Sequence, residues 1–105
     1  MAERLNVVPG ELRRAAREHL LAAEQLGAVP AGHAEVIAAL DSLGPVFAEF
    51  RDAGRELLDH RRACYEQQSA AHAEMADRLN RAADTWEQQD SDAARQVRAV
   101  TEADR

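Results

Sequence analysis

The stretch PVFAEFRDAGRELLDHRRACYEQQSAAHAEMADRLNRAADTWEQQDSDAARQVRAV, residues 45–100, decides the fold of this chain. It contains no glycine after Gly54 and no proline after its first residue. It is rich in alanine, glutamate, glutamine, arginine and leucine, the residues that lose least on entering a helix. Its large apolar residues recur at helical intervals: Phe47, Phe50, Leu57, Leu58, Tyr65, Met75, Leu79 and Trp86. We predict one amphipathic helix about 80 Å long, which cannot bury its apolar stripe alone.

The preceding residues have the pattern of a shorter helical arm over residues 9–43. Pro9 suits a first helical position, and helical apolar spacing follows it. Gly27 is a plausible helix stop, so residues 27–32 are expected to form a kink or short loop. From His33 the helical pattern resumes and continues to the end of the arm.

The dipeptide Gly44-Pro45 is the expected hinge, because glycine can end one helix and proline can begin the next. The sequence therefore predicts an all-α antiparallel helical hairpin, a single domain over residues 1–105. The longer second helix should project past the first arm. Its segment 88–92 carries residues that weaken a helix, so we expect a frayed C-terminal tail.

Composition excludes several classes of protein. The net charge is −6, which disfavours nucleic-acid binding and binding to an anionic membrane. A single cysteine, Cys64, forms no intrachain disulfide. No signal-peptide core and no run of transmembrane length is present, so we expect synthesis in the cytoplasm and no membrane insertion.

Candidate chemistry is sparse. His60 and Cys64 are four residues apart and could face one metal ion, but His72 lies about 12 Å further along the helix, too far to be a third ligand. The carboxylates are scattered among arginines, and no serine has the context of a nucleophile. We therefore predict no enzyme activity, no metal site and no cofactor.

Trp86 has two interpretations. It lies near the polar end of the long helix, and Asp90 follows it by one turn. It is either an aromatic that caps the hairpin core or part of an exposed recognition motif, with an aromatic and an acid on one helical face.

Three stretches together resemble the EspC-like family of type VII secretion in actinobacteria, within the Trp-X-Gly superfamily. They are the opening Leu5–Leu12, the corner Leu43–Asp52 and the tail Arg81–Asp90. The family's export signal is Tyr-X-X-X-Asp/Glu, and this chain has Trp86 and Asp90 at that spacing. Its only tyrosine is followed four residues later by a serine, and its corner is Gly-Pro in place of Trp-X-Gly.

The resemblance implies a helical hairpin that pairs with a second hairpin into a four-helix bundle and is exported folded to the cell surface or medium. The partner would be a second copy or a related hairpin, such as the N-terminal region of an effector or toxin. The export motor, an ATPase, would read Trp86 and Asp90. The residues expected to face other helices are Leu12, Leu20, Val36, Ile37, Leu40, Phe47, Phe50, Leu57, Leu58, Met75 and Leu79. The alternative is a cytosolic helical adaptor or obligate dimer with no export role.

Overall fold

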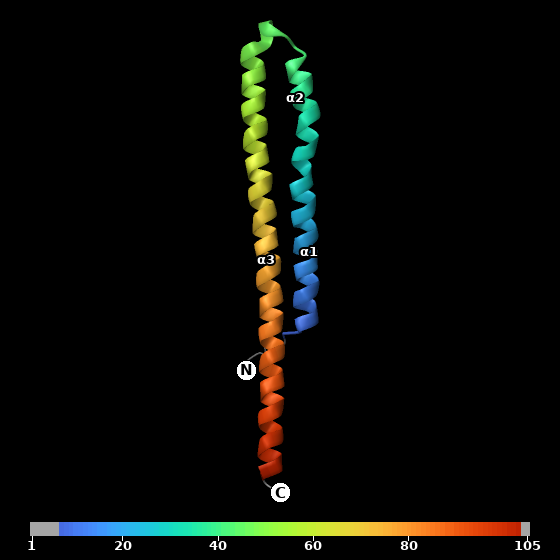
Figure 1. Ribbon diagram of the computed structural model, residues 1–105, viewed down its shortest axis with the longest axis vertical. Helices are drawn as coiled ribbons and strands as arrows, with labels where there is room; N and C mark the ends of the chain where they lie inside the picture. The colour runs from blue at the N-terminus through green and yellow to red at the C-terminus, as the bar shows by residue number, and fades with distance from the viewer. Residues whose placement is uncertain (1–6, 104–105) are drawn as a thin grey trace, which may run out of the picture.

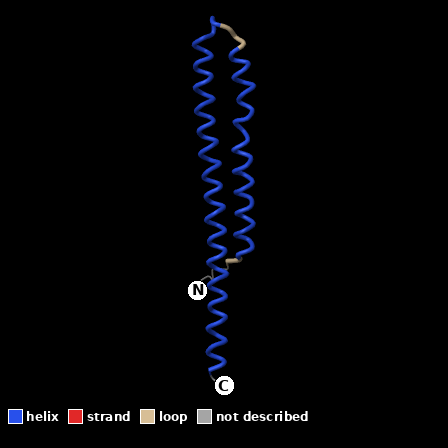
Figure 2. Tube along the Cα trace, viewed as in Figure 1, coloured by secondary structure: helices blue, strands red, loops and turns tan. Residues whose placement is uncertain are grey.

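The computed structural model describes residues 7–103. In chain order it contains α1 (Pro9–Ala28), the 3-10 turn η1 (Val29–Gly32), α2 (His33–Asp41), the 3-10 turn η2 (Pro45–Phe47) and α3 (Ala48–Ala103). Figure 2 shows helix and short loops over this described part, with no strand. The predicted all-α class is therefore confirmed. The first residues of the opening stretch, Leu5 and Asn6, lie outside the described residues.

The two arms lie side by side and run in opposite directions (Figure 1). The first arm, α1 with η1 and α2, covers only part of α3, whose C-terminal end continues alone. The molecule measures 91 × 28 × 14 Å, so it is a single layer one helix thick. Its radius of gyration is 24.9 Å, against about 13 Å for a compact domain of this length.

The surface area shows how little this layer buries. The chain exposes 8477 Å², whereas a compact monomer of 11.6 kDa exposes about 5,800 Å². No large side chain among the described residues is fully buried. The excess is comparable to the surface that obligate dimers remove from water.

The contact between the arms, here called the seam, is built from small residues. Its most buried members are Ala16, Ala23, Ala76 and Ala83, together with Leu58. On α3 the half-buried and buried positions alternate between steps of three and four residues, which is the heptad spacing of a coiled coil. Alanine lets the two backbones approach closely, so the seam is thin, as the alanine content predicts.

The corner depends on one glycine. Gly44 has φ 79° and ψ 178°, a conformation essentially restricted to glycine.

We expect Gly44→Ala to lower the free energy of unfolding by about 1–3 kcal/mol, because the added Cβ strains this backbone. Urea unfolding followed by circular dichroism measures it. Gly32→Ala is the matched control, since Gly32 has φ −72° and open space around its Cα. Equal stability of the two variants would contradict this account.

Two local expectations differ from the structure. Gly27 does not end α1, which continues to Ala28. The expected kink is the 3-10 turn η1, which tightens the helix for one turn and leads directly into α2. The seam spacing persists through this turn, with Leu26, Pro30 and His33 in succession on the inner side. A 3-10 turn can be tolerated here because burial of the same stripe continues across it.

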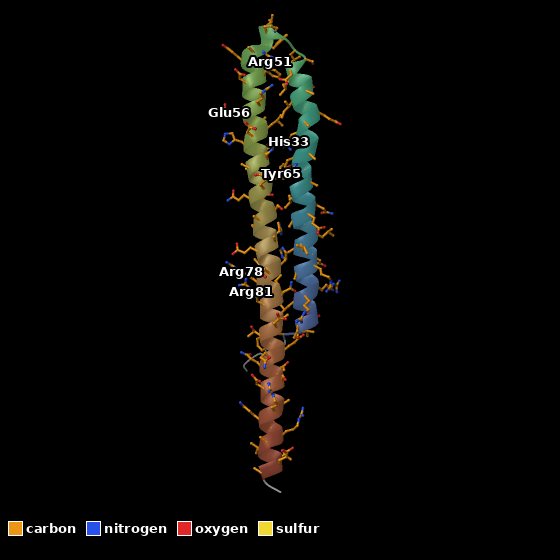
Figure 3. The ribbon with its side chains drawn as sticks, viewed as in Figure 1. His33, Arg51, Glu56, Tyr65, Arg78 and Arg81 are labelled. Carbon is orange, nitrogen blue, oxygen red and sulfur yellow. The ribbon has the colours of Figure 1, made fainter. Side chains whose placement is uncertain are left out.

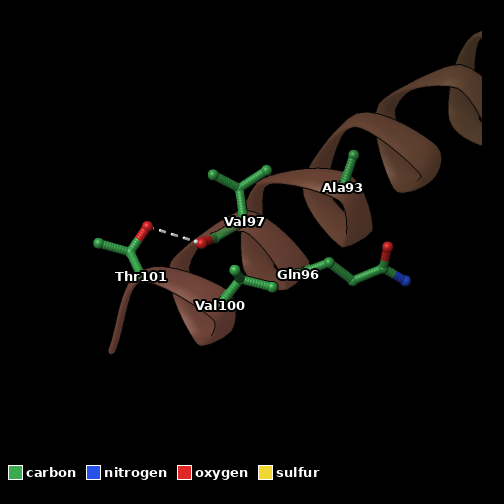
Figure 4. A pocket seen from close by; sticks show the side chains of 5 residues that line it. All are labelled: Ala93, Gln96, Val97, Val100 and Thr101. Carbon is green, nitrogen blue, oxygen red and sulfur yellow. Dashed lines mark hydrogen bonds between the residues drawn. The ribbon is translucent and has the colours of Figure 1, made fainter. Parts of the chain in front are cut away.

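The C-terminal tail is helical, although we expected fraying around residues 88–92. Side chains one turn apart support it: Gln88 donates to Asp92 at 3.1 Å, and Arg95 pairs with Asp92. Near the end, Thr101 Oγ1 donates to the carbonyl oxygen of Val97 at 3.0 Å (Figure 4). The side-chain pairs of Asp92 each add a few tenths of a kcal/mol to helix stability, whereas a threonine bond to the carbonyl four residues back does not.

Candidate interaction surface

Contacts across the seam fix the register of the two arms. His19 lies against His72, with their Nδ1 atoms 2.8 Å apart. Ser69 Oγ donates to the carbonyl oxygen of Ala23 at 2.7 Å. Nearer the corner, a Cβ on Gly54 would meet Leu40 Cδ1 at 2.8 Å, so glycine permits the close approach of α2 and α3 there.

One side of the hairpin, here called the charged face, is held by ion pairs. Arg13 donates to Glu87 and to Asp84, each at 2.6 Å, and so links the start of α1 to α3. The hydrogen bond to Glu87 is the main cause that raises the pKa of Arg13. Near the corner Arg55 pairs with Asp41, and this contact raises the pKa of Arg55. These pairs are exposed, so their contribution to stability is small.

The opposite side has no comparable ion pair between the arms within residues 7–103. In an antiparallel pair, a two-fold axis normal to the layer places equivalent heptad positions on the same side. The residues that immediately precede the buried small residues of each arm therefore share this face, for example Ala15 before Ala16 and Met75 before Ala76. On α3 the residues four positions earlier, such as Ala71, lie on the same side but further from the seam. The apolar members of this face, here called the apolar face, are Ala15, Ala22, Val29, Val36 and Leu43 on the first arm, and Phe47, Phe50, Leu57, Cys64, Ala71, Met75 and Ala82 on the second. On α3 the same side also carries Arg61, Gln68 and Arg78.

The large apolar side chains on the apolar face are highly exposed to solvent. Phe50 and Leu57 are each 61% exposed, and Val36 is 47% exposed. Isolated exposed apolar side chains are ordinary, but a row of them along both arms is typical of an interaction site. Shallow hollows lie along its α3 edge, one beside Cys64 and one beside Met75.

The residues predicted to face other helices divide into two groups. Leu58 is buried, and Leu12, Ile37, Leu40 and Leu79 are half-buried on the inner sides of the arms. The exposed members are Leu20, Val36, Phe47, Phe50, Leu57 and Met75. Of these, Leu20 follows His19 and so falls on the charged face, while the other five lie on the apolar face.

Trp86 and Asp90 lie on α3 at the level where the first arm begins. The register places Pro9 opposite Ala83, so Trp86 is one turn beyond the start of α1. Both residues continue the three-four spacing of the seam, and both are exposed, Trp86 by 38%. The aromatic and the acid therefore share one helical face, as the spacing predicts.

The same face continues into the projecting tail. Ala93, Val97 and Val100 keep the seam spacing and line a shallow hollow with Gln96 and Thr101 (Figure 4). Val97 and Val100 are about two-thirds exposed. The unpaired end of α3 thus presents Trp86, Asp90 and this apolar strip on one side.

The metal candidates are not brought together. His60 and Cys64 are exposed and line one hollow with Arg61, whose positive charge disfavours a cation there. His72 faces the other way, into the seam. Between residues 7 and 103 no group of three or more metal-ligating side chains occurs. Over the same range, no helix combines the length and apolarity needed to cross a bilayer.

Sequence reasoning missed the contacts that fix the seam. The helical spacing of α1 puts His19 in line with Leu12, Ala16 and Ala23 but indicates no partner for it, and it does not single out Arg13. The signal that could have found the His19–His72 pair is their nearly equal distance from the Gly44-Pro45 corner in the sequence. His33, which is buried, faces Tyr65 with ring centroids 6.4 Å apart (Figure 3).

A family model and two mycobacterial proteins match this chain over nearly its full length. The family model described as "Excreted virulence factor EspC, type VII ESX diderm" matches residues 1–99. Uncharacterized protein Rv0027 of Mycobacterium tuberculosis and uncharacterized protein Mb0028 of Mycobacterium bovis are each 43% identical to this chain over 105 residues, the full length of both proteins. No solved structure matches. Because the family model covers nearly the whole chain, the chain belongs to the EspC family of type VII secretion, a family of excreted proteins.

Proposed function

We propose that this chain is a type VII secretion substrate or co-secreted partner that pairs with a second helical hairpin and carries an export signal at Trp86 and Asp90. The observation that carries the proposal is the position of this pair. It lies where the first arm begins: Trp86 is between Asp84 and Glu87, the two residues that Arg13 contacts on α3, and Asp90 lies beyond both.

The apolar face supports the pairing. A second hairpin laid on this face would convert the single layer into a four-helix bundle, with Phe50, Leu57 and Met75 in its interior. A layer one helix thick leaves this face in water unless a second layer covers it. The partner is a second copy or a related hairpin, such as the N-terminal region of an effector or toxin.

The signal is well placed for recognition by the export motor ATPase. Aromatic side chains dominate the energetics of protein interfaces, and an adjacent carboxylate adds orientation. Trp86 lies at the edge of the proposed four-helix region and Asp90 lies one turn further out, because the first arm begins opposite Ala83. A folded pair could therefore present the signal without opening.

Light scattering of the purified chain, alone and mixed with the product of the neighbouring gene, tests the pairing. We expect a mass greater than one chain in at least one of the two samples, because the apolar face is unstable in water when unpaired. A homodimer would identify a second copy as the partner, and a one-to-one complex with the neighbour would identify a co-secreted hairpin. A well-folded monomer in both samples would contradict the proposal.

A further inference from the structure

The seam contains three histidines that neither the export signal nor the apolar face uses. His19 on α1, His33 on α2 and His72 on α3 all point into the contact between the arms, and the fourth histidine, His60, is exposed. We propose that these seam histidines make the pairing of the two arms acid-sensitive, so that the hairpin is closed near neutral pH and loosens as the pH falls toward about 5.5. The proposal does not depend on export or on a second hairpin.

The strongest observation is the contact between His19 and His72. Their Nδ1 atoms are 2.8 Å apart and the rings are tilted by 30°. A contact of this length is a hydrogen bond only if one nitrogen carries a hydrogen and the other offers a lone pair. When both rings are protonated, two N–H groups and two positive charges face each other at this distance. The doubly protonated pair must therefore separate.

No other charge faces this pair across the seam. The residues that pack around it from both helices are small: Ala16, Ala23, Ser69 and Ala76. Ser69 already donates to Ala23. The charged side chains within one turn are Arg17 and Glu18 on α1 and Glu74 on α3, and all three are exposed. Glu74 pairs with Arg78, and Glu18 with Arg14 at 3.9 Å. No seam carboxylate is therefore in position to neutralise a second proton.

His33 acts in the same direction. It is 6% exposed, and neither ring nitrogen has a hydrogen-bond partner among the described residues. On α3 it faces Tyr65, and the Arg61 guanidinium lies over that tyrosine ring at 5.8 Å. Arg62 and Glu66 lie within one turn of Tyr65, the register places Asp59 near the level of His33, and Glu35 is two residues from it on α2. The three carboxylates are exposed and none bonds either ring nitrogen, so an imidazolium buried at this position is unfavourable.

The sign of the effect follows from proton binding. An unfolded chain leaves all histidines in water, where they titrate near pH 6.5. The closed seam has no room for a second N–H at the contact between His19 and His72, and among the described residues it offers no hydrogen-bond partner to a protonated His33. The unfolded state therefore binds more protons as the pH falls, and stability falls with it.

The test is thermal unfolding of the full chain by circular dichroism, at one fixed protein concentration, between about pH 7.5 and pH 5.5. We expect the melting temperature of the natural sequence to fall by roughly 5 °C or more over this range. The double variant His19→Leu with His72→Leu should lose less than half as much, because its seam carries only one titrating side chain. His60→Gln is the matched control, and its melting temperature should shift as the natural sequence does.

Two further variants keep the test decisive. His72→Gln retains an amide that can bond His19 and removes one titrating ring, so it should also flatten the profile if the double variant does not fold. His33→Leu should remove part of the remaining pH dependence. A natural sequence with a flat profile, or a seam variant with the same pH dependence as the natural sequence, would overturn the proposal.

Discussion

Alanine at Trp86 or at Asp90 is expected to abolish export of the chain while leaving it folded and paired. Both residues lie past Ala83, the last buried residue of the seam on α3, so neither substitution removes a buried seam side chain. Loss of an interface anchor of this kind costs roughly 2 kcal/mol or more, about 30-fold in affinity for the motor. The measurement is the amount of protein in culture filtrate against lysate, in an actinobacterial host with a type VII system.

Two controls make this experiment specific. Trp86→Tyr restores the aromatic of the family's Tyr-X-X-X-Asp/Glu signal and should be exported normally. Gln89→Ala changes the exposed residue next to Asp90 and should have no effect. Circular dichroism of each purified variant confirms that it is helical.

The alternative interpretation of Trp86 gives a different result. If Trp86 only caps the hairpin core, Trp86→Ala should lower the melting temperature and Asp90→Ala should do nothing to export. Normal secretion of both alanine variants would exclude the proposed signal. Retention of Asp90→Ala in the cytoplasm with an unchanged melting temperature would exclude the packing interpretation.

The architecture was predictable because local signals agree along the chain. The long run after Gly54 without glycine or proline becomes the uninterrupted α3, and Gly44 supplies the positive φ that the corner needs. Helical periodicity is a strong signal when it extends over many turns. The same periodicity cannot locate a helix end within one turn, which is why Gly27 was taken as a stop and the tail as frayed.

The division of the apolar residues was not predictable in the same way. Periodicity identifies a stripe but does not say which neighbour covers each part of it. Leu58 and Leu57 are adjacent in sequence, yet one is buried against the first arm and the other is 61% exposed. The assignment needs the register, which is set by contacts such as Ser69 with Ala23 that a single sequence does not display.

Aspartate at Phe50 or Leu57 is expected to abolish pairing with the second hairpin. Each of these side chains should contribute about 1.5–3 kcal/mol when it is buried by a partner, and a carboxylate in its place leaves an unpaired charge in an apolar interface. The apparent dissociation constant should therefore rise at least about 100-fold, measured by light scattering over a concentration series.

Ala70→Asp is the matched control, because it adds the same charge to an exposed position toward the charged face of α3. The Phe50 and Leu57 variants should remain helical, since both side chains lie outside the seam. If they pair as tightly as the Ala70 variant, the apolar face is not the interface.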